Sequence, residues 1–188
     1  MNVFKDSPPL SAKVIFTAPV YTTENVEKVE KATSNIINYG RPSGEEIRME
    51  IVDVLHWKKI NENGESINNP LVSDAIYKGH VKNIIAAEGD VTTLTSIHYL
   101  IRKEEIIDTA KSTFLEGLSE DGCKISVLLN KQAALMKKLS FPADKEPLGS
   151  ILLEIQTETS EALLKIIDWL TPPTKDGIPL FELKLNEL

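Results

Sequence analysis

The chain has 188 residues and a mass of 20.9 kDa, with 41% hydrophobic and 26% charged residues, as expected of one domain with a continuous core rather than a disordered chain. Its 21 Lys and Arg residues against 28 Asp and Glu residues give a formal net charge of −7, so any nucleic-acid site has to be a local basic patch. The longest uncharged apolar stretch, 91–101, is eleven residues, too short for the roughly 20 residues of a membrane-spanning helix.

The chain begins with a predicted strand and helix. Residues 12–20 alternate between two faces, as a strand does. Thr22 or Thr23 can cap a helix that carries an apolar stripe and ends near Gly40. Two i,i+4 pairs are expected on its surface, Glu24 with Lys28 and Glu27 with Lys31.

A hairpin is predicted next. Alternating runs at 46–55 and 78–88 are typical of paired strands. The segment 56–77 between them is rich in turn formers and is expected to be an inserted mobile loop. Helical periodicity then covers 92–118, where the pattern leaves open whether there is one helix or two. A last helix opens at Thr159 or Ser160 and ends at two prolines, Pro172 and Pro173.

The remaining alternating runs complete the predicted sheet. Three of them suggest an antiparallel meander: 125–129, 135–141 and 151–155. The tail 181–186 also alternates, as a strand added to a sheet edge of this chain or of a partner would. These elements predict an α+β fold, with helices packed on one face of a mainly antiparallel sheet. We expect a single domain over 1–188, with its core at 12–172 and a C-terminal extension at 173–188.

No motif for catalysis or metal binding is found. His56, His80 and His98 have no metal-ligand spacing with one another or with Cys123, which is also the only cysteine and excludes a disulfide framework. The segment 117–124 has two glycines and a lysine, but not in the order of a phosphate-binding loop. The sequence therefore predicts no enzyme activity, no metal and no cofactor.

The clearest electrostatic feature is the segment 122–145, which holds five lysines against one aspartate in an otherwise acidic chain. Asn130 and Gln132 add hydrogen-bonding groups to it. If its lysines converge, the segment forms a ridge that can follow a phosphate backbone. The predicted RNA-binding residues are Lys124, Asn130, Lys131, Gln132, Lys137 and Lys138, with Arg102 and Lys103 as a flank.

Each of these residues also has a purely structural interpretation. The Asn-Lys-Gln run at 130–132 can be a tight connection whose side chains cap backbone groups. Arg102 and Lys103 can belong to a solvated stretch of helix. Lys137 and Lys138 would point to opposite faces of a regular strand, which weakens a common ridge. Trp169 is interpreted as a packed aromatic at a helix end rather than as a stacking platform for bases.

Several short motifs form a distinctive ordered set. They are Leu128–Ala134, Pro147–Gly149 and Ile167–Pro172, preceded by Ala18–Val20, Leu100–Lys103 and Ile106–Asp108. In this order, over about residues 12–180, they resemble an archaeal family of predicted exosome subunits or RNA-binding proteins. The resemblance implies RNA binding and an α+β fold like that of double-stranded-RNA-binding and large-ribosomal-subunit RNA-binding domains. Glu104 and Glu105 depart from the family, whose helix usually continues there with Gln and a basic residue, and the region 41–77 is longer than expected.

Two functions are therefore weighed. The first is a non-catalytic RNA-binding protein that contacts the phosphate backbone through the basic segment. The second is a dimeric adaptor that self-associates through exposed sheet edges and the alternating tail, without binding nucleic acid, which suits an acidic chain. The first nine residues show no signal region, so we expect a cytoplasmic protein.

Overall fold

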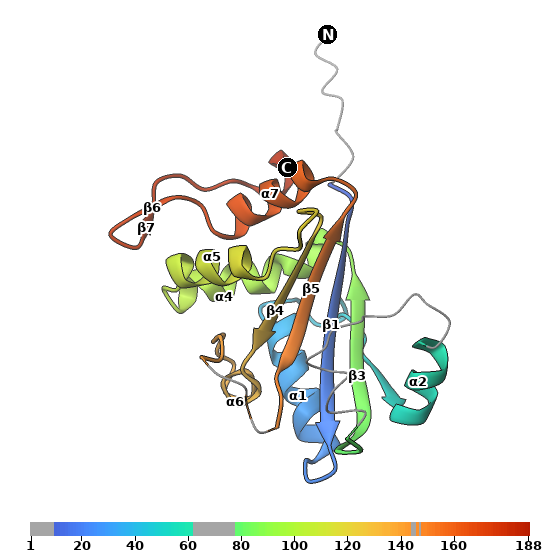
Figure 1. The fold of residues 1–188 in the computed structure, drawn as a ribbon. Coiled ribbons are helices and arrows are strands. Elements are labelled where there is room, and N and C mark those ends of the chain that lie inside the picture. The colour runs from blue at the N-terminus through green and yellow to red at the C-terminus, as the bar shows by residue number, and fades with distance from the viewer. Residues whose placement is uncertain (1–9, 62–77, 144–145, 147) are drawn as a thin grey trace.

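The computed structural model describes residues 10–61, 78–143, 146 and 148–188, and its centre is a five-stranded antiparallel sheet (Figure 1). The strand order is β2-β3-β1-β5-β4, with β1 at Ala12–Tyr21, β2 at Glu50–Asp53, β3 at Val81–Gly89, β4 at Lys124–Leu129 and β5 at Ile151–Thr157. The α-helices are α1 Val26–Ile37, α2 Val54–Asn61, α4 Thr95–Lys103, α5 Ile107–Glu116, α6 Lys131–Leu135 and α7 Ser160–Leu170. Short 3-10 helices are η1 Val91–Leu94 and η2 Leu185–Glu187, and a small hairpin consists of β6 Thr174–Lys175 and β7 Ile178–Pro179.

The first strand of the chain, β1, is the central strand of the sheet. It pairs with β3 on one side and β5 on the other, so that Val14 lies opposite both Gly89 and Ile155. Every residue from Val14 to Val20 is buried. A strand that is covered on both faces and paired on both edges needs a mostly apolar run, and Thr17 is the one polar residue in this segment.

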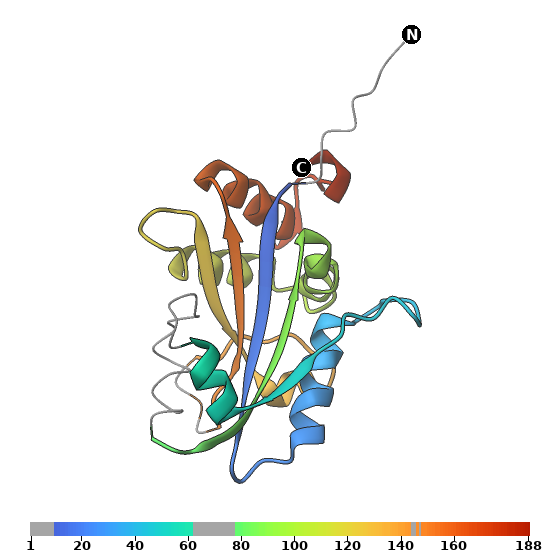
Figure 2. The same cartoon turned by 90° about the vertical axis from the view of Figure 1, so that its right-hand side faces the viewer.

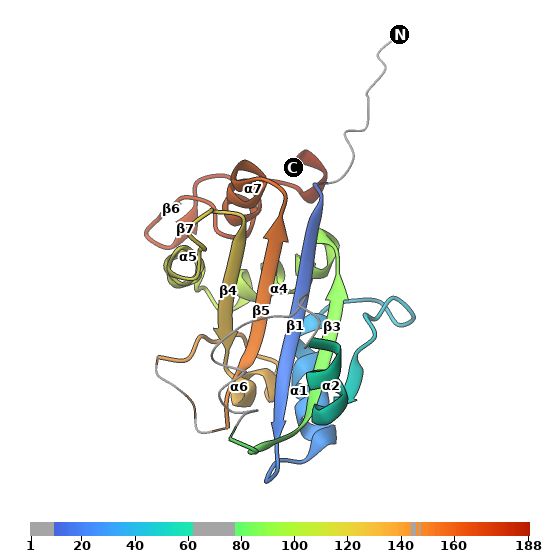
Figure 3. The same ribbon diagram turned by 45° about the vertical axis from the view of Figure 1, so that its right-hand side comes forward.

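Helices cover the two faces of the sheet unequally (Figures 1 and 2). The main core lies between one face and helices α1, α4, α5 and α7. The other face carries a smaller cluster of Val81, Ile84 and Leu152, against which Val54 and Trp57 of α2 pack. In Figure 3, α2 lies in front of the sheet, whereas α1 and α4 lie behind it. The prediction of an α+β fold is confirmed. Helices were expected on one face of the sheet only, and α2 is the helix that packs on the other face.

The predicted hairpin exists, but its first strand is shorter than expected. β2 pairs antiparallel with β3, with Val52 opposite Ile84. The chain enters α2 at Val54, within the predicted strand, and α2 also takes up the start of the expected loop 56–77. Residues 62–77 of that loop lie outside the described residues. The helical stretch 92–118 contains two α-helices, because the chain turns at Glu105, whose φ of 55° lies in the left-handed region.

The predicted three-stranded meander is wrong in its middle run. β4 and β5 pair directly, with Val127 opposite Leu153, but 135–141 is not a strand. Asn130 instead caps α6, because its side-chain oxygen accepts a hydrogen bond from the Ala133 amide at 2.7 Å. The Lys-Gln-Ala-Ala-Leu run that follows consists of good helix formers, and the capped helix is the better local solution.

The predicted tail strand at 181–186 is also not formed. The chain turns into η2 at Leu185, and the only strands after α7 in the described structure are β6 and β7. Their two-residue turn is Asp176-Gly177, and both residues have positive φ, which suits a tight hairpin.

Candidate nucleic-acid interface

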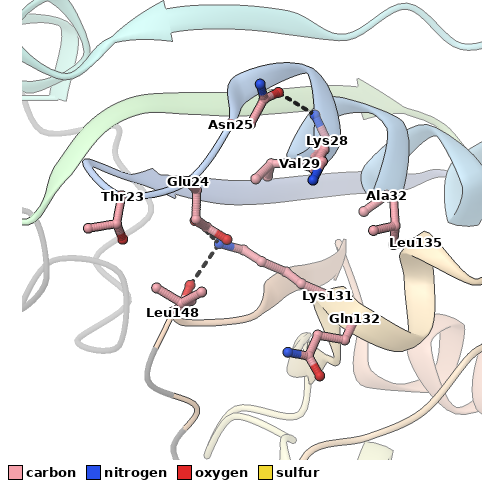
Figure 4. A pocket seen from close by; sticks show the side chains of 10 residues that line it. All are labelled: Thr23, Glu24, Asn25, Lys28, Val29, Ala32, Lys131, Gln132, Leu135 and Leu148. Carbon is pink, nitrogen blue, oxygen red and sulfur yellow. Dashed lines mark hydrogen bonds and ion pairs between the residues drawn. The ribbon is translucent and has the colours of Figure 1, made fainter.

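The ammonium group of Lys131 is enclosed by two segments that are distant from it in sequence, residues 19–24 and the loop at Leu148 (Figure 4). Only 7% of Lys131 is exposed. Its Nζ lies 2.9 Å from Oε2 of Glu24, donates to the Leu148 carbonyl at 2.7 Å and donates to the Pro19 carbonyl. Burial lowers the pKa of Lys131 below its ordinary value, and the Glu24 carboxylate opposes that change. Since an ammonium group has three donors and all are used, Lys131 cannot bind phosphate without breaking internal contacts.

Arg102 is likewise used inside the protein. Its guanidinium donates to the carbonyls of Trp169, at 3.1 Å, and Leu170, which are the last residues of α7. It also forms a two-pronged ion pair with Glu182, at 2.7 and 3.1 Å. A cation is favoured at a helix C-terminus, where carbonyl groups lack partners. Arg102 therefore ties α4 to α7 and to the C-terminal tail.

Trp169 is a packed aromatic, as the sequence indicated. It is 3% exposed, and the imidazole of His98 stacks on it with ring centroids 4.7 Å apart. Burial lowers the pKa of His98 to about 4, with a further lowering from Arg102 and an opposing effect of Glu182. His98 Nε2 is buried and has no hydrogen-bond partner, so the ring is held by packing.

Three further candidates have internal partners. Lys124 pairs with the fully buried carboxylate of Glu154. Lys124 also faces away from the main helix layer, because its neighbour Ile125 points into the main core. The ammonium group of Lys103 lies 4.9 Å from the ring centroid of Tyr39. Asn130, the cap of α6, also donates from its side chain to Glu146.

The motifs that carry the family resemblance therefore meet at two buried or half-buried cations. Lys131 joins the motif around Asn130 to those around Pro19 and Leu148, and Arg102 joins its own motif to the one around Trp169. The lysines of the basic segment do not converge, and Asp144 and Lys145 lie outside the described residues. The motifs hold the fold together, and the binding surface has to be sought elsewhere.

Gln132 and Lys137 each line a pocket with residues of α1, and Lys138 follows Lys137 in the chain. Asn35 of α1 donates to the carbonyls of Ala134 and Leu135, both at 3.1 Å, and so joins α1 to α6. The helical spacing of Lys28, Lys31 and Asn35 places the two lysines on the same side of α1. We call the exposed set beside this joint the α1–α6 surface: Lys28, Lys31, Gln132, Lys137 and Lys138.

The four lysines of the α1–α6 surface are unpaired. All four are exposed, and within the described part of the chain none has a carboxylate partner. The sequence had assigned Glu24 to Lys28, but α1 begins only at Val26 because Asn25 is its cap. Glu24 thus precedes the helix, and its carboxylate serves Lys131 and the Tyr21 amide. The sequence offered no signal for this rearrangement.

Two pockets flank the joint between α1 and α6. One has a volume of about 440 Å³ and lies near the start of α1 (Figure 4); it is lined by Thr23, Glu24, Asn25, Lys28, Val29, Ala32, Lys131, Gln132, Leu135 and Leu148. The other, of about 490 Å³, lies near the end of α1 and is lined by Ser34, Asn35, Asn38, Tyr39, Gly40, Arg41, Glu46 and Lys137. Each pocket thus contains an unpaired lysine of the α1–α6 surface.

The described residues contain no group of three or more His, Cys, Asp or Glu side chains placed to hold a metal ion. None of the helices in this part of the chain is long and apolar enough to cross a bilayer.

Comparisons with known proteins place this fold in a family. A family model described as RNA binding matches residues 13–159. The UPF0201 protein of Methanosarcina acetivorans is 36% identical over 171 residues, which are 90% of each chain. That of Methanopyrus kandleri is 33% identical over 178 residues, covering 94% of this chain and 95% of the relative. The crystal structure of the UPF0201 protein from Methanococcus jannaschii has a TM-score of 0.63 at 23% identity, covering 90% of this chain and 99% of that one. The chain therefore belongs to the archaeal UPF0201 family, and the family model that matches the chain is described as RNA binding.

Proposed function

We propose that this protein binds RNA without catalysing a reaction, and that the α1–α6 surface contacts the phosphate backbone. The observation that carries the proposal is the group of four exposed lysines without carboxylate partners, on a protein whose family model is described as RNA binding. Arg102 and Lys124, by contrast, are matched by acidic side chains.

The arrangement of the surface suits a chain of phosphates. Lys28 and Lys31 lie about one helical turn apart, which is roughly the 5–6 Å that separates neighbouring side chains on a helix. Lys137 and Lys138 follow the short helix α6 on the other side of the joint. Gln132 adds an exposed amide that can donate or accept, as contacts to a ribose hydroxyl require.

The negative charge of the whole molecule sets how such binding responds to salt. With a net charge of −7, the protein repels RNA at long range, and attraction is confined to the lysine-rich face. If four phosphates are neutralised, the logarithm of the affinity falls with the logarithm of salt concentration with a slope of about −3 to −4. RNA binding is therefore expected at low salt, and its affinity should be weak at physiological salt.

Charge reversal at matched sites tests the proposal. The affinity of the full-length protein for a structured RNA and for an unpaired RNA is measured by fluorescence anisotropy across a salt series. The test variant is Lys137→Glu with Lys138→Glu, and the control with the same charge change is Lys165→Glu with Lys175→Glu, at exposed sites on α7 and β6. At least a ten-fold loss is expected for the test variant and less than two-fold for the control. Equal losses, or no binding by the wild type at micromolar concentration, would overturn the proposal.

A protein-interaction role is a second candidate, because the segment after α7 exposes apolar side chains. Ile178 is 69% exposed, Leu180 63% and Phe181 49%. Such exposed apolar residues, on the hairpin and just after it, favour contact with another protein surface, including a second copy of this chain. Solution mass by light scattering, compared between the wild type and a triple serine variant at these positions, tests this. If the wild type is a monomer, or if the substitutions leave its mass unchanged, the segment does not mediate self-association.

A further inference from the structure

Two tyrosines form a stacked pair beside the α1–α6 surface. Tyr99 on α4 is 57% exposed. Its ring stacks on that of Tyr39, which follows α1, with centroids 5.6 Å apart and an angle of 26° between the ring planes. Offset stacking of this kind holds the exposed ring in a fixed orientation. The exposed aromatic surface is thus ordered before any ligand arrives.

Cationic groups hold and border the pair. Lys103 lies 4.9 Å from the centroid of the Tyr39 ring, and a hydrogen bond to the Tyr39 side chain raises the pKa of Lys103. Arg41, two residues after Tyr39, has a fixed guanidinium, since it donates to the Thr92 carbonyl at 2.6 Å and to the Ile37 carbonyl at 3.4 Å. Lys103 also lies 3.9 Å from the Glu104 carboxylate, so the aromatic pair lies in a rigid environment with two cations and one acidic group.

The pocket of about 490 Å³ adjoins the pair, because Tyr39 forms part of its wall. Arg41 and Lys137 line the same pocket, with Glu46 as its acidic member. Lys137 has a φ of 58°, in the left-handed region after α6 where glycine is the usual residue. A lysine therefore occupies a backbone conformation that favours glycine, and its side chain lines the pocket.

We propose that Tyr99 and this pocket together hold one unpaired nucleotide of a bound RNA. The base stacks on the exposed ring of Tyr99, and the adjoining phosphate lies in the pocket with Lys137 and Arg41. In an RNA duplex both faces of each base are already covered by neighbouring bases, so only a looped-out or single-stranded base fits this arrangement. The inference rests on the proposed function and adds the class of RNA that the surface takes.

The test compares an unpaired RNA of about 12 nucleotides with a fully paired duplex of the same sequence, in anisotropy titrations at fixed low salt. Tyr99→Ala is expected to lower the affinity for the unpaired RNA by roughly five- to a hundred-fold, the range observed for loss of one stacked base. It leaves the affinity for the duplex within about two-fold of the wild type. Tyr99→Phe retains binding, and Tyr99→Leu, which keeps an apolar side chain but has no ring, loses it.

Leu164→Ala is the control, because Leu164 is an exposed apolar residue on α7, outside every surface proposed to bind a partner. This variant is expected to bind both RNAs as the wild type does. If Tyr99→Ala and Tyr99→Leu bind unpaired RNA as the wild type does, while the charge reversal at Lys137 and Lys138 still weakens binding, the stacking inference is wrong and the proposed function stands. If the wild type binds neither RNA, both are wrong.

Discussion

The Glu24 carboxylate and the Lys131 ammonium group lie 2.9 Å apart, although 107 residues separate them in the chain. The pair is almost fully enclosed, and the Tyr21 amide and two carbonyls complete its hydrogen bonds. A buried ion pair with satisfied hydrogen bonds contributes little net stability, but loss of one partner leaves an uncompensated charge.

Removal of the Lys131 charge is therefore expected to be destabilising. Lys131→Met leaves the Glu24 carboxylate buried without a cation, and the free energy of unfolding should fall by about 3–5 kcal/mol. The double variant Lys131→Met with Glu24→Gln should recover at least about 1 kcal/mol, because no lone charge remains. Urea denaturation of the four proteins measures both values. A loss in the double variant equal to the sum of the single losses would show that the two groups are not coupled.

The stability of the protein is expected to decrease between pH 6.5 and pH 4. The pKa of His98 is about 4 in the folded protein against an ordinary value of 6.5, so across this range the unfolded chain binds a proton that the folded protein does not. Stability is thus fully present above pH 6.5 and is lost as the pH falls, by up to about 3 kcal/mol. The hydrogen bond from Arg102 lowers the pKa of Glu182, which adds a loss in the same direction at the acid end.

His98→Phe is the control for this pH dependence. Phenylalanine can keep the stacking on Trp169 and removes a ring nitrogen that has no hydrogen-bond partner. The free energies of unfolding of the two proteins, measured from pH 7 to pH 4, should lie close together at neutral pH and separate in acid, where only the wild type loses the contribution of His98. Parallel curves would rule out His98 as the titrating group.

The C-terminal tail should detach when its ion pair is removed. Glu182→Gln keeps the size of the side chain but weakens the contact with Arg102, and cleavage after α7 by a protease should become faster. The stability of the rest of the domain should change by no more than about 1 kcal/mol, because Glu182 is half-exposed. Lys175→Gln, at an exposed site in the hairpin, should leave the cleavage rate unchanged.

Lys137 should carry a trade-off between stability and binding. Lys137→Gly relieves the left-handed backbone and should raise the free energy of unfolding by about 0.5–1 kcal/mol, while RNA affinity falls. Lys138→Gly serves for comparison, since Lys138 has an ordinary φ and gains no such relief. If Lys137→Gly is both more stable and equally able to bind, Lys137 has no part in the RNA site.

Local sequence patterns predicted the parts of this fold that local interactions determine. The alternation of β1 and the capped apolar stripe of α7 are examples, and so is the burial of Trp169. The alternating run 135–141 predicts a strand, but the same alternation also fits the end of a short helix and the loop after it. In that case the cap at Asn130 determined the structure.

The site was harder to predict than the fold, because its electrostatics depend on contacts between distant segments. Lys131 appeared to be a mobile surface charge until the fold placed Glu24 beside it. The same contact removes the apparent helix partner of Lys28 and leaves that lysine unpaired. A count of charges along the chain therefore identified a basic segment, whereas the exposed basic surface draws on two segments about 100 residues apart.

The position of β1 at the centre of the sheet has a consequence for synthesis on the ribosome. Val14 pairs with Ile155, so one edge of this early strand waits for its partner until most of the chain has been translated. During that interval an apolar strand with unpaired backbone groups is open to association with other nascent chains. The sheet can close only late in translation, after β5 has been synthesised.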